Sequence, residues 1–194
     1  MQIVEKVRNT NETGINVVFN PCGSGISEIN TPINFFSHML QLFCAHSMCD
    51  IKLNANSFDN DPHHLVEDVA ITLGEALKES LGDKRGIKRY ANVILPMDEA
   101  LIMCALDISG RAYCNCDINI KEPMTSGFET VLLAHFFDSF SKSAAITLHI
   151  KMLDGKDPHH IIEAVFKAFA HALKDAISID LRNPDAVPST KGVL

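Results

Sequence analysis

The sequence predicts an α+β fold built from two similar halves, about residues 1–95 and 96–194. Two segments 96 residues apart share one pattern, Asp-Pro-His-His-Leu-Val-Glu at 61–67 and Asp-Pro-His-His-Ile-Ile-Glu at 157–163. Each is preceded by a further matched histidine, His38 or His135. The expected strands and helices follow the same order in both halves, and no low-complexity linker separates them. We therefore expect a single domain of two pseudo-symmetric lobes that arose by duplication.

In the first half, apolar alternation and helix-start residues predict a hairpin, a helix, a strand and a long helix. The long helix is the best defined, because Asp61 suits the N-cap, Pro62 suits the first turn and Gly82 ends the apolar pattern. The expected ranges are 2–8 and 15–19 for the hairpin, 31–46 for the first helix, 50–56 for the strand and 61–81 for the long helix.

In the second half, we expect three strands, a helix, a further strand and a long helix. Asp157 and Pro158 open the last helix as Asp61 and Pro62 open the earlier one. The expected ranges are 90–95, 100–108 and 112–120 for the first three strands, 128–143 for the helix, 145–152 for the next strand and 157–177 for the last helix. Residues 180–194 are expected to form an irregular tail.

The composition is that of a globular protein, with 46% hydrophobic and 21% charged residues. A formal net charge of −7 argues against general nucleic-acid binding but allows a local basic pocket for an anionic ligand. The six cysteines form no Cys-x-x-Cys pair and are expected to be buried, reduced thiols. The chain shows no secretory signal and no apolar run long enough for a membrane span. We therefore expect a cytoplasmic protein that does not enter a membrane.

The repeated histidine motif predicts divalent-metal binding. On a helix, His63 and His64 each lie within one turn of Glu67, but the two adjacent imidazoles diverge by about 100°. Each can therefore serve a different ion, and the same geometry holds for His159, His160 and Glu163. Two repeats supply six imidazoles and two carboxylates, which is four protein ligands for each of two ions.

A mixed nitrogen and oxygen ligand set suits Mn, Fe, Co, Ni or Zn. Four protein ligands leave open positions on an octahedral ion, which favours catalysis over a structural role. One helix serving two ions also suggests that a site draws ligands from more than one place, either within the chain or in another subunit. The alternative explanation is that these histidines have no role in metal binding. Histidines without a shared function need not recur at the same spacing in both halves, so the repeat favours metal ligands. His149 and His171 lie outside the pattern and are interpreted as ordinary histidines.

Cationic residues gather in two places. Residues 84–89 read Lys-Arg-Gly-Ile-Lys-Arg, and the tail carries Pro-Ser-Thr-Lys-Gly at 188–192. Together with Arg111 they supply the guanidinium, ammonium and hydroxyl donors that a phosphate group needs. A solvated loop is the alternative interpretation of residues 84–89.

Several motifs together resemble the imidazoleglycerol-phosphate dehydratase family over nearly the whole chain. They are the paired His-His-x-x-Glu motifs, Pro-Met-Asp-Glu-Ala at 96–100, Asp-Ile-Ser-Gly-Arg at 107–111 and Pro-Ser-Thr-Lys-Gly at 188–192. The resemblance implies a hydro-lyase of histidine biosynthesis that converts imidazole glycerol phosphate to imidazole acetol phosphate. It also implies a duplicated fold similar to the second domain of ribosomal protein S5. Two Mn²⁺ ions per site and a homo-oligomer of 24 subunits with shared active sites are further implications.

The same resemblance implies the roles of individual residues. The implied metal ligands are His38, His63, His64, Glu67, His135, His159, His160 and Glu163. The implied substrate contacts are Glu12, His46, Arg89, Arg111, Lys167, Ser189 and Lys191. Glu67 and Glu163 act in catalysis as ligands, and Glu12 is the candidate for proton transfer, with Asp98 or a metal-bound water as alternatives. For His46, a favourable position at the end of a helix is the alternative explanation.

The chain departs from the family pattern beside these residues, at Ser37, Ser47 and Pro62, and no departure removes a ligand. Two other functions compete with the dehydratase. A di-metal phosphohydrolase would release inorganic phosphate. A metal-dependent storage or scaffold protein would leave imidazole glycerol phosphate unchanged.

Overall fold

The computed structural model describes residues 1–192 and 194 and confirms the α+β class. Residue 193, part of the predicted irregular tail, lies outside the described residues. The first half contains β1 (Val4–Asn9), β2 (Thr13–Asn20), β3 (Ser27–Asn30), α1 (Asn34–Ser47), β4 (Asp50–Ser57) and α2 (Pro62–Leu81). The second half contains β5 (Tyr90–Met97), β6 (Ala100–Asp107), β7 (Tyr113–Asp117), β8 (Met124–Thr125), β9 (Phe128–Glu129), α3 (Val131–Ala144), β10 (Thr147–Asp154) and α4 (Pro158–Ile177).

The two halves form sheets of the same topology. The first sheet has the strand order β1-β2-β4-β3 and the second has the order β5-β6-β10-β7. In both sheets the last strand of the order runs parallel to its neighbour, whereas the other pairs are antiparallel. This correspondence confirms the predicted pair of similar lobes.

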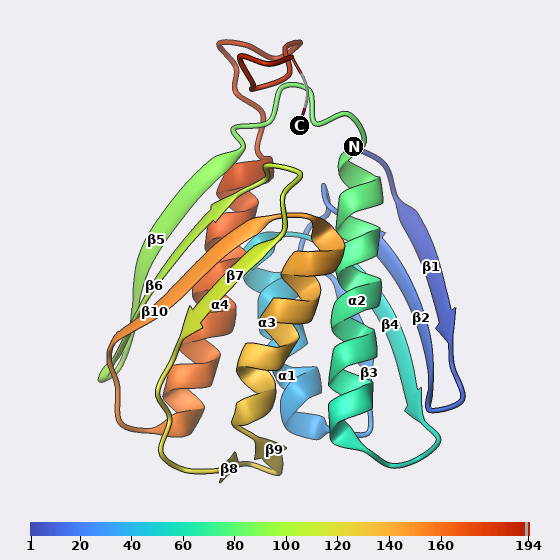
Figure 1. Cartoon of the computed structure of the whole chain (residues 1–194), viewed down its shortest axis with the longest axis vertical. Helices are drawn as coiled ribbons and strands as arrows, with labels where there is room; N and C mark the ends of the chain where they lie inside the picture. The colour runs from blue at the N-terminus through green and yellow to red at the C-terminus, as the bar shows by residue number, and fades with distance from the viewer. Residues whose placement is uncertain (193) are drawn as a thin grey trace.

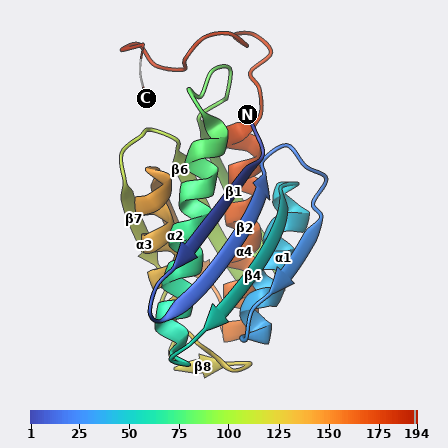
Figure 2. The ribbon, with the colours of Figure 1, turned by 90° about the vertical axis from the view of Figure 1, so that its right-hand side faces the viewer.

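The helices lie between the two sheets, so that the molecule has a sheet–helix–sheet arrangement (Figure 1). Turning the molecule brings the first sheet to the front, with the helices behind it (Figure 2). The apolar faces of both sheets and all four helices of the described chain contribute to one buried cluster. Aromatic rings join the halves inside it: Phe43 of α1 stacks on Phe169 of α4 at 5.6 Å between ring centroids. Burial of such large side chains is the main stabilising term of the fold.

Both long helices begin where the sequence predicts. The side chain of Asp61 accepts a hydrogen bond from the backbone N–H of His63 at 2.8 Å, and Asp157 accepts one from His159 at 2.7 Å. Each aspartate satisfies a free donor of the first turn, and the proline that follows has no N–H to leave unpaired. The capping fixes the paired histidines at the start of each helix.

The close approach of α2 to α3 depends on Gly74. A Cβ atom at this position would lie 2.6 Å from the carbonyl oxygen of Phe140. Glycine therefore allows the two helix backbones to approach more closely than a side chain would permit. This spacing matters because α2 and α3 each carry residues of the candidate site.

Some predicted boundaries are wrong for local reasons. The strand β3 was not predicted, because its sequence Ser-Glu-Ile-Asn has one apolar residue and little alternation. The helix α3 begins at Val131 and not at 128, since residues 128–129 pair with 124–125 as a short hairpin. The helix α1 begins at Asn34, two residues after Pro32. The six cysteines are free as predicted, but Cys22 is exposed, and Cys114 and Cys116 are half-buried.

No helix within residues 1–192 combines the length and apolar character that crossing a bilayer requires.

Candidate metal centre

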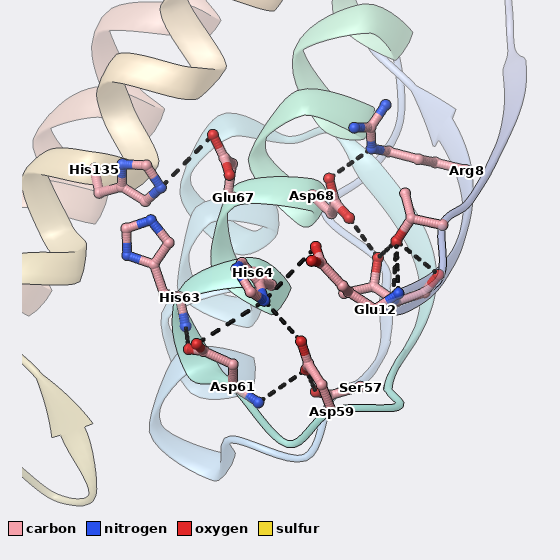
Figure 3. A network of polar contacts seen from close by, with 12 residues as sticks. Arg8, Glu12, Ser57, Asp59, Asp61, His63, His64, Glu67, Asp68 and His135 are labelled. Carbon is pink, nitrogen blue, oxygen red and sulfur yellow. Dashed lines mark hydrogen bonds and ion pairs between the residues drawn. The ribbon is translucent and has the colours of Figure 1, made fainter.

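The first histidine cluster joins the two halves of the chain. His63 and Glu67 lie one turn apart on α2, and His135 reaches them from α3 (Figure 3). The rings of His63 and His135 stack with their centroids 4.0 Å apart, and His135 Nε2 lies 3.8 Å from Glu67 Oε1. One donor atom from each residue lies within 4.8 Å of the others, so the three residues are close enough to share one metal ion.

The donor atoms of this cluster fit a divalent cation. Nε2 of His135 is buried and has no hydrogen-bond partner among residues 1–192 and 194. A buried polar atom without a partner is costly, and a bound cation would satisfy it. Burial, and then the neighbouring His63, lower the pKa of His135, so its imidazole is held neutral as a metal ligand must be.

The second cluster is made by the equivalent residues with the halves exchanged. His159 and Glu163 lie one turn apart on α4, and His38 reaches them from α1. Glu163 Oε2 lies 3.3 Å from His159 Nε2 and 3.8 Å from His38 Nε2. Each cluster thus takes a histidine and a glutamate from one half and a histidine from the other.

The two clusters differ in charge. Nζ of Lys167 lies 2.6 Å from Glu163 Oε1, whereas Ile71 occupies the equivalent place one turn beyond Glu67. Burial opposes ionisation of Glu163, but the hydrogen bond and charge of Lys167 outweigh it and lower the pKa of Glu163. The structure therefore places Lys167 at the second cluster, where the sequence predicts a substrate contact.

The remaining histidine of each motif points away from these clusters, to a carboxylate. Nδ1 of His64 donates to Asp59 Oδ2 at 2.7 Å, and Nδ1 of His160 donates to Glu99 Oε2 at 2.8 Å. These hydrogen bonds raise the pKa of both histidines. Because a carboxylate can only accept, Nδ1 carries the proton, and in the neutral ring Nε2 keeps its lone pair. The predicted divergence of adjacent histidines is confirmed.

Glu12 lies beside His64 at the tip of the β1–β2 hairpin (Figure 3). Its carboxylate is 3.6 Å from His64 Nδ1, and together with Asp59 the three residues bring their donor atoms within 4.8 Å. The backbone of Glu12 is held on both sides, because its N–H donates to Thr10 Oγ1 and its carbonyl accepts from Phe58 N–H at 2.7 Å.

A polar network that the sequence interpretation missed fixes this hairpin against α2. Asp68 is buried and accepts hydrogen bonds from Arg8 Nε at 2.6 Å and from Thr13 Oγ1. Asp68 lies directly after Glu67, so the residue that anchors the hairpin adjoins a candidate ligand. A buried aspartate in an otherwise apolar helix face was the available sequence indication, since such a residue requires partners.

The cationic residues form two separate groups. Arg89 donates to Asp107 through Nε at 2.7 Å and Nη2 at 3.1 Å, and Nη1 donates to the Pro188 carbonyl. Arg111 Nη2 is 3.9 Å from the same Asp107, and its side chain is 70% exposed. This first group lies beside the tail, where Ser189 Oγ accepts the N–H of Lys191.

The second group consists of His46 on α1 and Lys167 and His171 on the facing helix α4. Nδ1 of His46 is 3.1 Å from Nε2 of His171, which the sequence interpretation treated as ordinary. Burial and then His171 lower the pKa of His46, and Lys167 acts in the same direction.

The interpretation of residues 84–89 as a solvated loop is wrong for Lys84 and Arg89, which are buried.

The fold and the two histidine–glutamate clusters define a duplicated α+β protein with candidate divalent-metal sites. Comparison with known proteins identifies its family. The sequence profile described as "Imidazoleglycerol-phosphate dehydratase" matches residues 31–173. The protein of that name from Caldicellulosiruptor saccharolyticus is 48% identical over 194 residues, which cover 100% of this chain and 98% of the relative. The one from Lactococcus lactis subsp. cremoris is 48% identical over 200 residues, with the same coverage.

Solved structures agree with these relatives. The crystal structure of imidazoleglycerol-phosphate dehydratase from Staphylococcus aureus has a TM-score of 0.84 and 35% identity, and covers 92% of this chain and 100% of its own. The structure of the Pyrococcus furiosus protein in complex with (S)-C348 has a TM-score of 0.85 and 40% identity, and covers 97% of this chain and 100% of its own. The chain belongs to the imidazoleglycerol-phosphate dehydratase family, and is therefore a hydro-lyase of histidine biosynthesis.

The two histidine–carboxylate pairs predict a pH dependence for the stability of the metal-free protein. The pKa of Asp59 and that of Glu99 are each about 2, chiefly because backbone N–H groups and then the histidines favour the carboxylate. This contribution is present above the unfolded carboxyl pKa, about 4, and is lost as the pH falls toward 2. The raised pKa values of His64 and His160 contribute stability below about 6.5, which is lost as the pH rises through the folded pKa.

Both contributions coexist between about pH 4.5 and 6.5. After chelation, calorimetry should show the largest difference in Tm between the natural chain and the triple variant Asp59→Ala/Glu12→Ala/Glu99→Ala in that window. Glu12 is included because its carboxylate lies close enough to His64 to replace Asp59. The difference should shrink at pH 3 and at pH 9. An equal difference at all three pH values would show that these pairs do not titrate as described.

Proposed function

We propose that the protein catalyses the metal-dependent dehydration of imidazole glycerol phosphate to imidazole acetol phosphate. The observation that carries the metal dependence is Nε2 of His135 beside His63 and Glu67, which is buried without a hydrogen-bond partner in the described part of the chain. A second cluster of the same composition lies on α4 and α1. Family membership supports the substrate and the reaction type.

We propose two Mn²⁺ ions per active site. His63, Glu67 and His135 would hold one ion, and His38, His159 and Glu163 would hold the other. A bound divalent ion supplies Lewis-acid stabilisation to the imidazole ring of the substrate. Imidazole and carboxylate donors suit Mn²⁺ and also other transition metals.

His64 and His160 support a shared active site. Neither converges on the clusters of its own chain, yet each is held with Nε2 available as a ligand. We propose that they complete the ligand sets of neighbouring subunits in a homo-oligomer of 24 chains. A cytoplasmic location, and a single domain formed by residues 1–194, belong to the same proposal.

The reaction removes the hydroxyl group from the carbon next to the ring and a proton from the adjacent carbon. The resulting enol becomes the ketone, and one water molecule leaves. No carbonyl activates the C–H bond, so a positioned base is needed. Glu12 is the proposed proton-transfer group, because its carboxylate lies at the hairpin tip beside His64 without a hydrogen bond from the described part of the chain. Glu67 and Glu163 are the proposed ligand carboxylates.

The two groups of basic residues are the candidates for phosphate recognition. Of the two arginines beside Asp107, Arg111 is the more exposed, whereas Arg89 is held by Asp107 and by the Pro188 carbonyl of the tail. Ser189 and Lys191 lie in that tail, and His46 and Lys167 lie on the facing helices. We propose that these residues bind the phosphate end of the substrate, with contributions from more than one subunit.

Metal removal tests this function directly. The chelated protein should lose dehydratase turnover, and stoichiometric Mn²⁺ should restore it with formation of the ketone and no inorganic phosphate. Full turnover by protein shown to be metal-free would contradict the metal dependence. Release of phosphate would identify a phosphohydrolase instead.

The Glu12→Gln variant tests the proton-transfer role. It keeps the size of the side chain but removes its basicity, so kcat should fall by about 10²–10⁴. Mn²⁺ stoichiometry should be unchanged, which separates loss of the base from loss of a ligand. A kcat near that of the natural chain would remove Glu12 from this role.

A further inference from the structure

The duplicated halves use equivalent hairpin glutamates differently. Strand β2 matches strand β6, since Val17 pairs with Leu53 as Cys104 pairs with Ile150 in the second sheet. Glu12 directly precedes β2 and Glu99 directly precedes β6. The two glutamates therefore occupy the same place in their halves, at the tip of a hairpin beside the second histidine of the motif.

Both carboxylate oxygens of Glu99 accept hydrogen bonds. Its Oε2 accepts from Nδ1 of His160 at 2.8 Å, and its Oε1 accepts from the backbone N–H of Asp157 at 2.8 Å and from that of Lys156 at 3.3 Å. One carboxylate thus joins the histidine ring to the N-cap of α4. This double contact fixes both the tautomer and the direction of the ring.

In the first half, Asp59 makes this pair of contacts in place of Glu12. Asp59 Oδ2 accepts from Nδ1 of His64 at 2.7 Å, and Oδ1 accepts from the backbone N–H of Asp61 at 2.9 Å. Asp61 is the N-cap of α2, as Asp157 is of α4. Glu12 stays 3.6 Å from the same imidazole nitrogen.

The connecting segments explain why the second half needs its glutamate. Residues 58–61 between β4 and α2 read Phe-Asp-Asn-Asp, whereas residues 155–157 between β10 and α4 read Gly-Lys-Asp. The second segment is one residue shorter and has no carboxylate before its N-cap. The first half also has Asp68 to pin its hairpin, and Ala164 stands at the equivalent position of α4.

We propose that Asp59 and Glu99 are positioning residues for His64 and His160, and that Asp59 thereby leaves Glu12 free for the reaction. The claim that Glu12 is left free for the reaction rests on the proposed role of Glu12. The claim that Asp59 and Glu99 position the histidines depends on the hydrogen bonds alone. Loss of such a carboxylate partner weakens metal binding by about 10–100-fold in comparable sites.

The matched variants Glu12→Ala and Glu99→Ala test whether Glu99, and not Glu12, positions its histidine, without any turnover assay. Binding of Mn²⁺ to the assembled, substrate-free protein is followed by the electron paramagnetic resonance of the free ion. Glu99→Ala should weaken Mn²⁺ binding by about 10–100-fold, and Glu12→Ala should change it less than twofold. Equal effects of the two variants would overturn the division of roles. Glu99→Gln, which has one acceptor oxygen for the N–H groups of His160 and Asp157, should restore only part of the affinity.

The variant Asp59→Ala tests the release of Glu12. Glu12 should move into hydrogen-bond distance of His64 Nδ1, and Mn²⁺ affinity should be largely kept. The double variant Asp59→Ala/Glu12→Ala should lose about 10–100-fold in affinity. The inference would be overturned by a crystal structure of Asp59→Ala in which Glu12 is still 3.6 Å or more from His64 Nδ1 and that nitrogen has no carboxylate partner.

Measurement of kcat separates the catalytic role of Glu12 from the positioning role of Asp59 and Glu99. If Glu12 is the base, Asp59→Ala at saturating Mn²⁺ should lower kcat at least tenfold, because the carboxylate becomes engaged. If Glu12→Gln retains normal kcat, the proposed base is wrong, while the Mn²⁺ affinities still decide whether Asp59 and Glu99 position the histidines.

Discussion

The structure depends on the packing of each long helix against the shorter helix of the other half. α2 packs on α3 and α4 packs on α1, so each candidate metal cluster takes two residues from one half and one from the other. A helix alone can present a histidine and a glutamate one turn apart, but a third donor must come from a neighbouring element. The inter-half helix contacts therefore determine both the apolar core and the site. Gly74 shows how closely they are constrained, because even one methyl group would separate α2 from α3.

Duplication supplied two equivalent frameworks, which have since diverged at a few positions around the clusters. Lys167 neutralises Glu163, whereas Ile71 leaves Glu67 without a cationic neighbour on its helix. Asp68 anchors the first hairpin, and Ala164 cannot anchor the second. The candidate ligand positions are the same in both halves, whereas the residues that contact them differ.

The sequence predicted the elements that carry strong local patterns. The long helices, their aspartate caps and the matched placement of the repeated histidines and glutamates were predicted because spacing and capping are local properties of the chain. The strand β3 was missed, since its pairing with β4 and not its composition makes it a strand. The roles of Asp59 and Asp68 could not be predicted either. Their partners lie on other elements, and both are ordinary aspartates until His64 and Thr13 are brought beside them.

Anomalous scattering at the manganese absorption edge, from crystals of the Mn²⁺-loaded protein, tests the central claim most directly. Two peaks should appear for each chain, one bound by His63, Glu67 and His135 and the other bound by His38, His159 and Glu163. Peaks at which these residues are absent, or a single ion bound by histidines of one half alone, would contradict the assembly of each cluster from both halves.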